Sequence, residues 1–182
     1  MLELNFTPYP TLVTERLVLR ELSLDDAPEM FIQRSHPVIG KFIKRAPAVN
    51  IDEAREFIER MLQNEKNNES ITWAITLKDE NKLIGSICLW NIEKETHVAE
   101  VGYSLHYDYF GKGIMNEALS EIVKYGFEKM NLHRIDAYTN KNNSASLKLL
   151  LRNKFDRNHT FEANYEDKEE LEYNVIYTLE KP

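Results

Sequence analysis

Residues 101–118 read VGYSLHYDYFGKGIMNEA, and this stretch says most about the fold. Its first five residues are strand-like, Gly111 and Gly113 form a turn, and helical spacing of apolar residues follows at once. Glycine lets the backbone approach a ligand closely or adopt a positive φ. Because the first amides of a helix have no internal acceptor and lie at its positive end, the stretch predicts a site for a diphosphate.

Two common nucleotide-binding motifs do not fit these residues. A P-loop is excluded because no Gly-Lys-Ser/Thr sequence follows the turn. A dinucleotide-binding βαβ unit is disfavoured because its third glycine would fall at Asn116 and because a predicted hairpin precedes the motif. Taken alone, Gly-x-Gly before a helix is also compatible with a plain connecting turn. Distinguishing a ligand site from such a turn requires the sequence around it.

The rest of the chain predicts an α/β (α+β) protein. Apolar runs predict up to seven strands, over residues 12–22, 71–77, 83–92, 98–105, 133–139, 155–161 and 171–179. Helical spacing and capping residues predict four helices, over residues 23–35, from 52 onward, 113–129 and 143–153. Proline and glycine predict a loop over residues 36–49. This order predicts a mixed central sheet of about six to seven strands with helices on both faces.

Composition narrows the function classes. The chain has 30 acidic and 23 basic residues and a net charge of −7, which opposes nucleic acid as the main partner because such binding needs a basic face. The negative charge would favour a cationic substrate, or it serves only solubility. No linker, repeat or low-complexity tract occurs, so residues 1–182 are expected to form one domain.

The same composition bears on compartment and redox chemistry. Cys88 is the only cysteine and lies within an apolar run, so we expect a buried, inert thiol. The five histidines form no metal constellation, and we expect no metal. No signal sequence and no run of about 18 apolar residues is present, which predicts a cytoplasmic protein that does not interact with a membrane.

With these residues in place, the sequence resembles the GNAT superfamily of N-acetyltransferases, and within it the RimJ/RimL-like ribosomal-protein N-terminal acetyltransferases. The resemblance covers nearly the whole chain. Its carriers are TERLVLR at 14–20, WAI at 73–75, LIGSI at 83–87, AEVGY at 99–103, YFGKGIMNEA at 109–118, NSAS at 143–146 and LLRNKF at 150–155. The resemblance implies a GNAT fold and acetyl-CoA as co-substrate.

The coenzyme-binding signature of the superfamily, Gln/Arg-x-x-Gly-x-Gly/Ala, falls on residues 110–115. Gly113 fits the signature, whereas Phe110 and Met115 depart from it in a way that is similar to the RimJ/RimL branch. The contacts implied there come mainly from backbone amides, which tolerate such changes. The implied coenzyme-binding residues of this turn are Phe110, Gly111, Lys112, Gly113, Ile114 and Met115.

The resemblance also places the thioester. It implies that the strand through Tyr103 and Leu105 diverges from its neighbour and hydrogen-bonds the pantetheine arm. The backbone N–H of Leu105 would then stabilise the oxyanion, an effect of about 3 kcal/mol in measured cases. Asn143 matches a position that contacts the coenzyme arm, although capping of the following helix explains this asparagine equally well.

Two further residues are candidates for proton transfer. Glu100, on the strand that leads to the thioester, is the candidate base, and its alternative role is a structural ion pair. Ser146 stands where RimL-like proteins are thought to use a serine hydroxyl as proton donor, and its alternative role is helix capping. The tyrosine that many superfamily members carry seven residues after the motif asparagine is replaced by Leu150. Relatives also have glycine at Lys154, so Asn153 is expected to supply the left-handed residue that ends the helix.

These residues predict direct acetyl transfer from acetyl-CoA to an amine, most simply a protein N-terminal amine such as that of a ribosomal protein. Making such an amine neutral at pH 7 costs about 1 kcal/mol, against about 4.6 for a lysine. Small-molecule amines (a polyamine, an amino acid or an aminoglycoside) and a non-catalytic acyl-CoA-binding module are the alternatives. We expect residues 36–50 and 156–170 to form the acceptor pocket, and the resemblance also suggests a homodimer.

Overall fold

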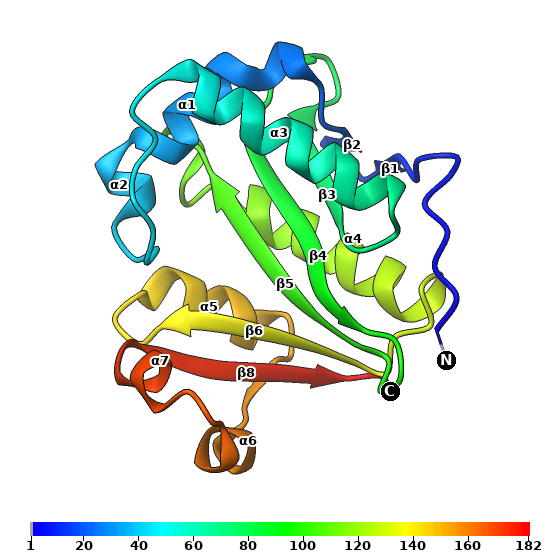
Figure 1. The fold of residues 1–182 in the computed structure, drawn as a ribbon, viewed down its shortest axis with the longest axis vertical. Coiled ribbons are helices and arrows are strands. Elements are labelled where there is room, and N and C mark those ends of the chain that lie inside the picture. The colour runs from blue at the N-terminus through cyan, green and yellow to red at the C-terminus, as the bar shows by residue number, and fades with distance from the viewer. Residues whose placement is uncertain (1) are drawn as a thin grey trace.

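The computed structural model describes residues 2–182 and contains one eight-stranded sheet with the order β1-β2-β3-β4-β5-β6-β8-β7 (Figure 1). The strands are β1 (Leu12–Val13), β2 (Leu17–Glu21), β3 (Ile71–Leu77), β4 (Gly85–Glu93), β5 (Val98–Leu105), β6 (Arg134–Asn140), β7 (Asp156–Arg157) and β8 (Asn174–Glu180). Neighbouring strands are antiparallel except β5 and β6, which are parallel. The predicted mixed sheet is confirmed, with eight strands in place of six or seven.

Seven helices accompany the sheet in the described residues. They are α1 (Ala27–Ser35), α2 (Pro37–Gly40), α3 (Ile51–Lys66), α4 (Ile114–Glu128), α5 (Ser144–Arg152), α6 (His159–Asn164) and α7 (Lys168–Tyr173). Helices α1 and α3 cover one face of the sheet and α4 covers the other, as Figure 1 shows. The predicted placement of helices on both faces is therefore confirmed. Across residues 2–182, none of these helices is long and apolar enough to cross a membrane.

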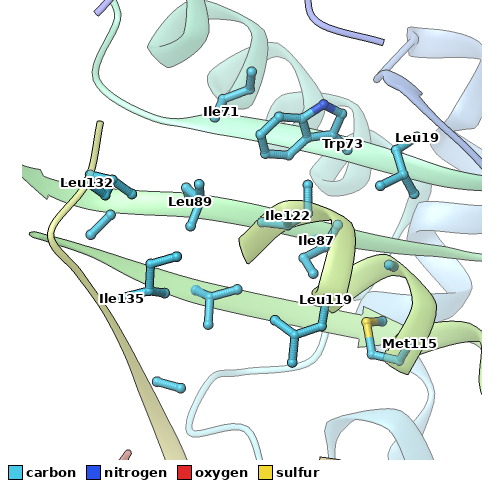
Figure 2. Packing of buried hydrophobic residues seen from close by; sticks show 14 of the residues in the cluster. Leu19, Ile71, Trp73, Ile87, Leu89, Met115, Leu119, Ile122, Leu132 and Ile135 are labelled. Atoms are coloured by element: carbon cyan, nitrogen blue, oxygen red, sulfur yellow. The ribbon is translucent and has the colours of Figure 1, made fainter. Parts of the chain in front are cut away.

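The main hydrophobic core lies between the sheet and α4 (Figure 2). Alternate residues of the central strands point to this side, among them Trp73 of β3 and Ile87 of β4, and both are fully buried. Leu119 and Ile122 come from α4 at helical spacing and pack on them. This packing fixes the start of α4, and with it the glycine turn, against the sheet.

The two central parallel strands β5 and β6 are paired over only three residues each. Val98–Glu100 pairs with Arg134–Asp136, and the pairing then ends. Strand β5 continues along β4 as far as Leu105, while β6 continues along β8 as far as Asn140. Figure 1 shows the two strands diverging from this point. The divergence leaves the facing edges of β5 and β6 without strand partners.

The single first strand expected over residues 12–22 is wrong, because the chain turns between β1 and β2. The Thr14 backbone N–H donates to the Leu17 carbonyl at 3.0 Å, and the Leu17 N–H donates to the Thr14 hydroxyl, also at 3.0 Å. Such local side-chain bonds compete with a continuous strand. The two halves then pair with each other as a short antiparallel hairpin.

Two other expectations need correction. The strand expected over 155–161 is reduced to β7, and that expected over 171–179 starts at Asn174, because α6 and α7 intervene. Asn158 and Asp167 cap these helices by accepting backbone N–H groups, which explains why they form. The expected loop 36–49 contains the short helix α2.

The residue that ends α5 in a left-handed conformation is Lys154, with φ of 65°, and not Asn153, whose φ is −90°. The Lys154 N–H donates to the Leu151 carbonyl and the Phe155 N–H to the Leu150 carbonyl, both at 3.0 Å. Phe155 is fully buried, and its packing holds the chain in this turn. Lysine therefore adopts the conformation for which relatives use glycine.

Replacing Leu119 by alanine tests the packing of α4 on the sheet. We expect Leu119→Ala to lower the free energy of unfolding by about 3–5 kcal/mol, because the residue is completely buried and leaves a cavity. The neighbouring Ser120→Ala, on the exposed side of the same helix, should stay within about 0.5 kcal/mol of wild type. Urea denaturation measures both. Equal small losses would show that α4 does not hold the core.

Candidate active site

The glycine turn at residues 110–115 has the backbone geometry that a diphosphate site requires. Gly111 and Gly113 have φ of 72° and 76°, in the left-handed region that favours glycine. The first helical hydrogen bond of α4 runs from the Glu117 N–H to the Gly113 carbonyl at 3.1 Å. Within residues 2–182 no acceptor takes the N–H groups of residues 111–116. These donors are therefore free to bind an anion.

Side chains around the turn take different roles from its backbone. Ile114 and Met115 are buried in the core, so they can offer a ligand only their backbone N–H groups. Phe110 is half-exposed, and Lys112 is exposed, with its Nζ atom 5.4 Å from the centre of the Tyr109 ring. The buried pair anchors the turn, and Lys112 adds positive charge beside it.

An ion-paired bracket holds the turn against the β1–β2 hairpin. The Glu117 carboxylate accepts hydrogen bonds from the Thr14 hydroxyl at 2.5 Å, the Arg16 backbone N–H at 2.8 Å and the Arg16 Nε–H at 2.6 Å. Arg16 also donates from Nη1 to the Lys112 carbonyl at 3.0 Å. Burial alone would raise the pKa of Glu117, but these hydrogen bonds lower it below its ordinary value. Arg16 thus connects the hairpin to the backbone of the turn itself.

A groove of about 520 Å³ opens beside this bracket. Its lining includes Arg16, Gly113, Asn116 and Arg152. The Asn153 side chain donates to the Asn116 side-chain oxygen at 3.0 Å, so the start of α4 and the end of α5 are joined here. The lining also holds the carboxylates of Glu15, Glu117 and Glu121, so the side chains of the groove are of mixed charge. The row of free N–H groups is therefore the feature that suits a ligand with several phosphates.

The unpaired edge of β5 has backbone groups that point into the opening between β5 and β6. The His106 N–H donates to the Ile84 carbonyl at 2.8 Å, across the β4–β5 pair. Because N–H groups alternate between the two edges of a strand, those of Leu105 and Tyr103 point the other way, toward β6. The predicted position of the Leu105 N–H is thus compatible with hydrogen bonding to a ligand between the strands.

Three predicted residues from two elements meet at the far side of this opening. The Tyr103 hydroxyl of β5 and the Ser146 Oγ of α5 are 2.7 Å apart. Asn143 caps α5, since its side-chain oxygen accepts the Ser146 N–H at 3.2 Å. Ser146 is buried, and burial raises the pKa of Tyr103 to about 12. Asn143 therefore caps α5, and its side-chain oxygen is already engaged in this hydrogen bond.

Glu100 lies where β5 and β6 separate, on the sheet face opposite the Tyr103 side chain. Its Oε1 accepts a hydrogen bond from the Asn91 side chain at 2.6 Å. Burial raises the pKa of Glu100, the Asn91 bond lowers it, and Asp136, Glu93 and Glu170 raise it further. The result is a pKa above the ordinary glutamate value, which suits a carboxylate that takes up protons.

Asn91 and Trp90, at the end of β4, are the neighbours of the Glu100 carboxylate. Asn91 has φ of 46° at the point where the β4–β5 register shifts, and this bulge turns its side chain to Glu100. Trp90 lies directly across from Glu100 and is half-exposed. A Cβ at Gly102 would lie 3.6 Å from the Trp90 indole nitrogen, so the indole extends over the glycine. Glu100 is thus flanked by an exposed aromatic surface.

The expectations about thiol and metal chemistry can be compared with the same region. Burial raises the pKa of Cys88 to about 12, and its Sγ lies 3.5 Å from the Gly102 carbonyl oxygen. Such a thiol stays protonated, as expected of an inert one. The side chain is half-buried and not buried as the apolar run predicted, because Cys88 lies on the less covered face of β4. Over the described residues, no group of three or more histidine, cysteine or acidic side chains is arranged to hold a metal ion.

Sequence reasoning missed the bracketing residues. Arg16 and Glu117 stand inside stretches that carry the resemblance, yet their meeting depends on contacts about one hundred positions apart in the chain. No sequence pattern pointed to Asn91, because its hydrogen bond to Glu100 depends on a bulge in β4. The coenzyme-turn residues, Glu100, Tyr103, Asn143 and Ser146 were named from the sequence. Asn143 and Ser146 meet locally in the cap of α5, whereas Tyr103 reaches Ser146 only through tertiary structure.

Known proteins are similar to this chain in sequence and in fold. A family model described as acetyltransferase (GNAT) domain matches residues 16–156. The uncharacterized N-acetyltransferase p20 of Bacillus licheniformis is 34% identical over 140 residues, which are 77% of this chain and 79% of that protein.

Two solved structures have the same fold at low sequence identity. The ribosomal-protein-S5-alanine acetyltransferase of Vibrio fischeri has a TM-score of 0.77 and 21% identity, covering 95% of this chain and 100% of the other. RimL, a ribosomal L7/L12 α-N-protein acetyltransferase in complex with coenzyme A, has a TM-score of 0.78 and 19% identity, covering 93% and 96%. At these identities the likeness establishes the fold.

Removing Glu117 tests whether the bracket positions the turn. We expect Glu117→Ala to raise the dissociation constant of coenzyme A about fivefold, since the loss of one net hydrogen bond is worth about 1 kcal/mol. The matched control is Glu121→Ala, one helical turn later in the same groove.

Both variants remove one negative charge near the bound phosphates. Charge alone would therefore tighten binding in both, whereas the bracket predicts weaker binding only for Glu117→Ala. Isothermal titration calorimetry on the two variants distinguishes these explanations. Unchanged or tighter binding by Glu117→Ala would contradict a positioning role for the bracket.

Proposed function

This chain belongs to the GNAT acetyltransferase family and is an acetyl-CoA-dependent N-acetyltransferase, and we propose that its acceptor is a protein N-terminal α-amine, such as that of a ribosomal protein. Support for the acceptor comes from the shared fold with ribosomal-protein acetyltransferases and from the groups around Glu100. A cytoplasmic location and a homodimer are part of the same proposal.

The observation that carries the coenzyme part of the proposal is the row of free N–H groups at residues 111–116. These donors would bind the diphosphate, with Arg16, Lys112 and Arg152 supplying positive charge at the ends of the row. The unpaired edge of β5 at Tyr103 and Leu105 would then hydrogen-bond the amide-containing arm as an added strand does. Asn143 contributes by fixing the start of α5.

Transfer would proceed by direct attack of the amine on the thioester, without a covalent enzyme intermediate. The Leu105 N–H stabilises negative charge on the carbonyl oxygen as the C–N bond forms. Glu100 accepts the proton that the nitrogen loses, directly or through one water. Ser146 donates a hydrogen bond to the sulfur as the C–S bond breaks. Each group lies on an element that borders the divergence of β5 and β6.

The surroundings of Glu100 favour an amine of moderate basicity. An N-terminal amine has an ordinary pKa of about 7.7–8.0, so a single carboxylate with a modestly raised pKa suffices as its base. A lysine amine, with a pKa of about 10.4, would need a much stronger base. The acidic neighbours Glu93, Asp136 and Glu170 attract the ammonium form of the acceptor, and Trp90 offers an apolar surface beside it.

An amine panel tests the acceptor. Coenzyme A release is followed with peptides that begin with serine or alanine, N-terminally blocked lysine peptides, spermidine, free amino acids and an aminoglycoside. We expect kcat/KM to be at least about tenfold higher for the unblocked peptides, because blocked peptides retain only the more basic amine. A preference for any of the small molecules would instead assign a small-molecule acceptor.

Replacing Glu100 by glutamine tests the base through pH. We expect kcat/KM of Glu100→Gln to fall about 100-fold near pH 7, within the usual range for loss of a general base. The deficit should shrink above about pH 9, since the amine is then neutral without help. In wild type, activity should also be lost with decreasing pH at a value above the ordinary glutamate pKa, because the pKa of Glu100 is raised.

The control for this profile is Glu95→Gln, an exposed acid in the turn that follows β4. It removes the same charge without touching Glu100, so its pH profile should match that of wild type. A deficit of Glu100→Gln that stays constant at every pH would show that Glu100 is structural.

A further inference from the structure

We propose that Tyr103 is a positioning residue for the leaving group: its hydroxyl donates to the Ser146 Oγ, which leaves the serine proton free to hydrogen-bond the departing sulfur. The proposal rests on the proposed function, because it assigns the sulfur to the opening between β5 and β6. It adds a role for Tyr103 beyond hydrogen bonding through its backbone.

The contact crosses the opening between the two strands. Tyr103 belongs to the part of β5 that no longer pairs with β6, whereas Ser146 lies in the first turn of α5, beyond β6. Their oxygens are 2.7 Å apart, a normal length for a hydroxyl–hydroxyl hydrogen bond. Ser146 is buried and Tyr103 is half-buried, so the serine side of the bond is shielded from competing water.

The contact itself allows either hydroxyl to be the donor, and the proposal assigns that part to Tyr103. The half-buried phenol of Tyr103 has one proton to donate, and Ser146 Oγ is its only hydrogen-bond partner within the described chain. Serines in helices often donate to the carbonyl four residues earlier, as Ser35 does to Phe31 at 2.7 Å. Ser146 makes no such bond, because the residue four positions earlier precedes α5. When Tyr103 donates, the serine therefore keeps a proton for another acceptor.

The pair acts by hydrogen bonding rather than by giving up a proton. Burial raises the pKa of Tyr103 to about 12, whereas a thiol has an ordinary pKa near 8.5. Moving the phenol proton onto the thiolate would thus be unfavourable by a factor of more than about a thousand. The balance is simple: the C–N bond forms, the C–S electron pair moves to sulfur, nitrogen loses one proton to Glu100, and sulfur later gains one from solvent.

The position at which many superfamily members carry a tyrosine cannot serve in this chain. Leu150 occupies that position, is fully buried and packs in the main core. The phenol hydroxyl near the start of α5 is instead supplied by Tyr103, which lies on β5 across the opening. It therefore comes from a strand, whereas Leu150 belongs to α5 itself.

A double-mutant cycle tests the proposal with Tyr103→Phe, Ser146→Ala and the combination of the two. The acceptor is whichever amine the wild type acetylates best, so failure of N-terminal peptides as substrates leaves the test intact. We expect each single variant to lower kcat about tenfold, with KM for acetyl-CoA and the calorimetric Kd for coenzyme A within about twofold of wild type. The double variant should be no slower than the slower single variant, because the two residues act as one unit.

The control is Tyr109→Phe, which removes a phenol hydroxyl beside Lys112 that makes no hydrogen bond to Ser146 in the described residues, and its kcat should match that of wild type. Thermal unfolding of every variant shows whether a loss of kcat reflects a loss of folded protein. The proposal is overturned if Tyr103→Phe keeps wild-type kcat, if its effect appears in KM or Kd instead, or if the two substitutions multiply in the double variant.

Discussion

The site depends on one constraint, the end of β5–β6 pairing after three residues on each strand. Backbone N–H and C=O groups need partners wherever water is excluded, and the facing edges of these strands lack them within the sheet. An extended chain of amides can supply the missing hydrogen bonds, as an added strand does. Side chains alternate along β5, so that Tyr103 with Ser146 borders the opening from one face of the sheet and Glu100 from the other.

The remaining elements hold the ends of this opening in place. Packing of α4 on the sheet fixes the glycine turn, and the bracket of Arg16 and Glu117 connects that turn to the N-terminal hairpin. Free N–H groups at a positive helix end and nearby cationic side chains make the turn an anion site. The acetyl donor would be held at its diphosphate end by this turn and along its arm by β5, while the amine approaches from the side of Glu100.

Much of this architecture was predictable from local patterns, and the misses have identifiable causes. Apolar runs located β3, β4 and β5, and capping residues located α1 and α5. The break between β1 and β2 depends on local hydrogen bonds of Thr14 and on a carboxylate from α4, and the polar stretch after Phe155 folds into short capped helices that apolar patterns do not reveal. In the site, single residues were predictable but pairs were not: Asn91 with Glu100 and Tyr103 with Ser146 meet only through tertiary structure.

The central claim is that backbone N–H groups of the turn and of the β5 edge bind the coenzyme. Amide ¹H–¹⁵N spectra of the labelled protein, titrated with acetyl-CoA, test it most directly. The account predicts large shifts for the N–H groups of residues 111–116, Tyr103 and Leu105, with little change along β2 and α3. Binding that leaves these amides unshifted, or no binding by the folded protein, would contradict it.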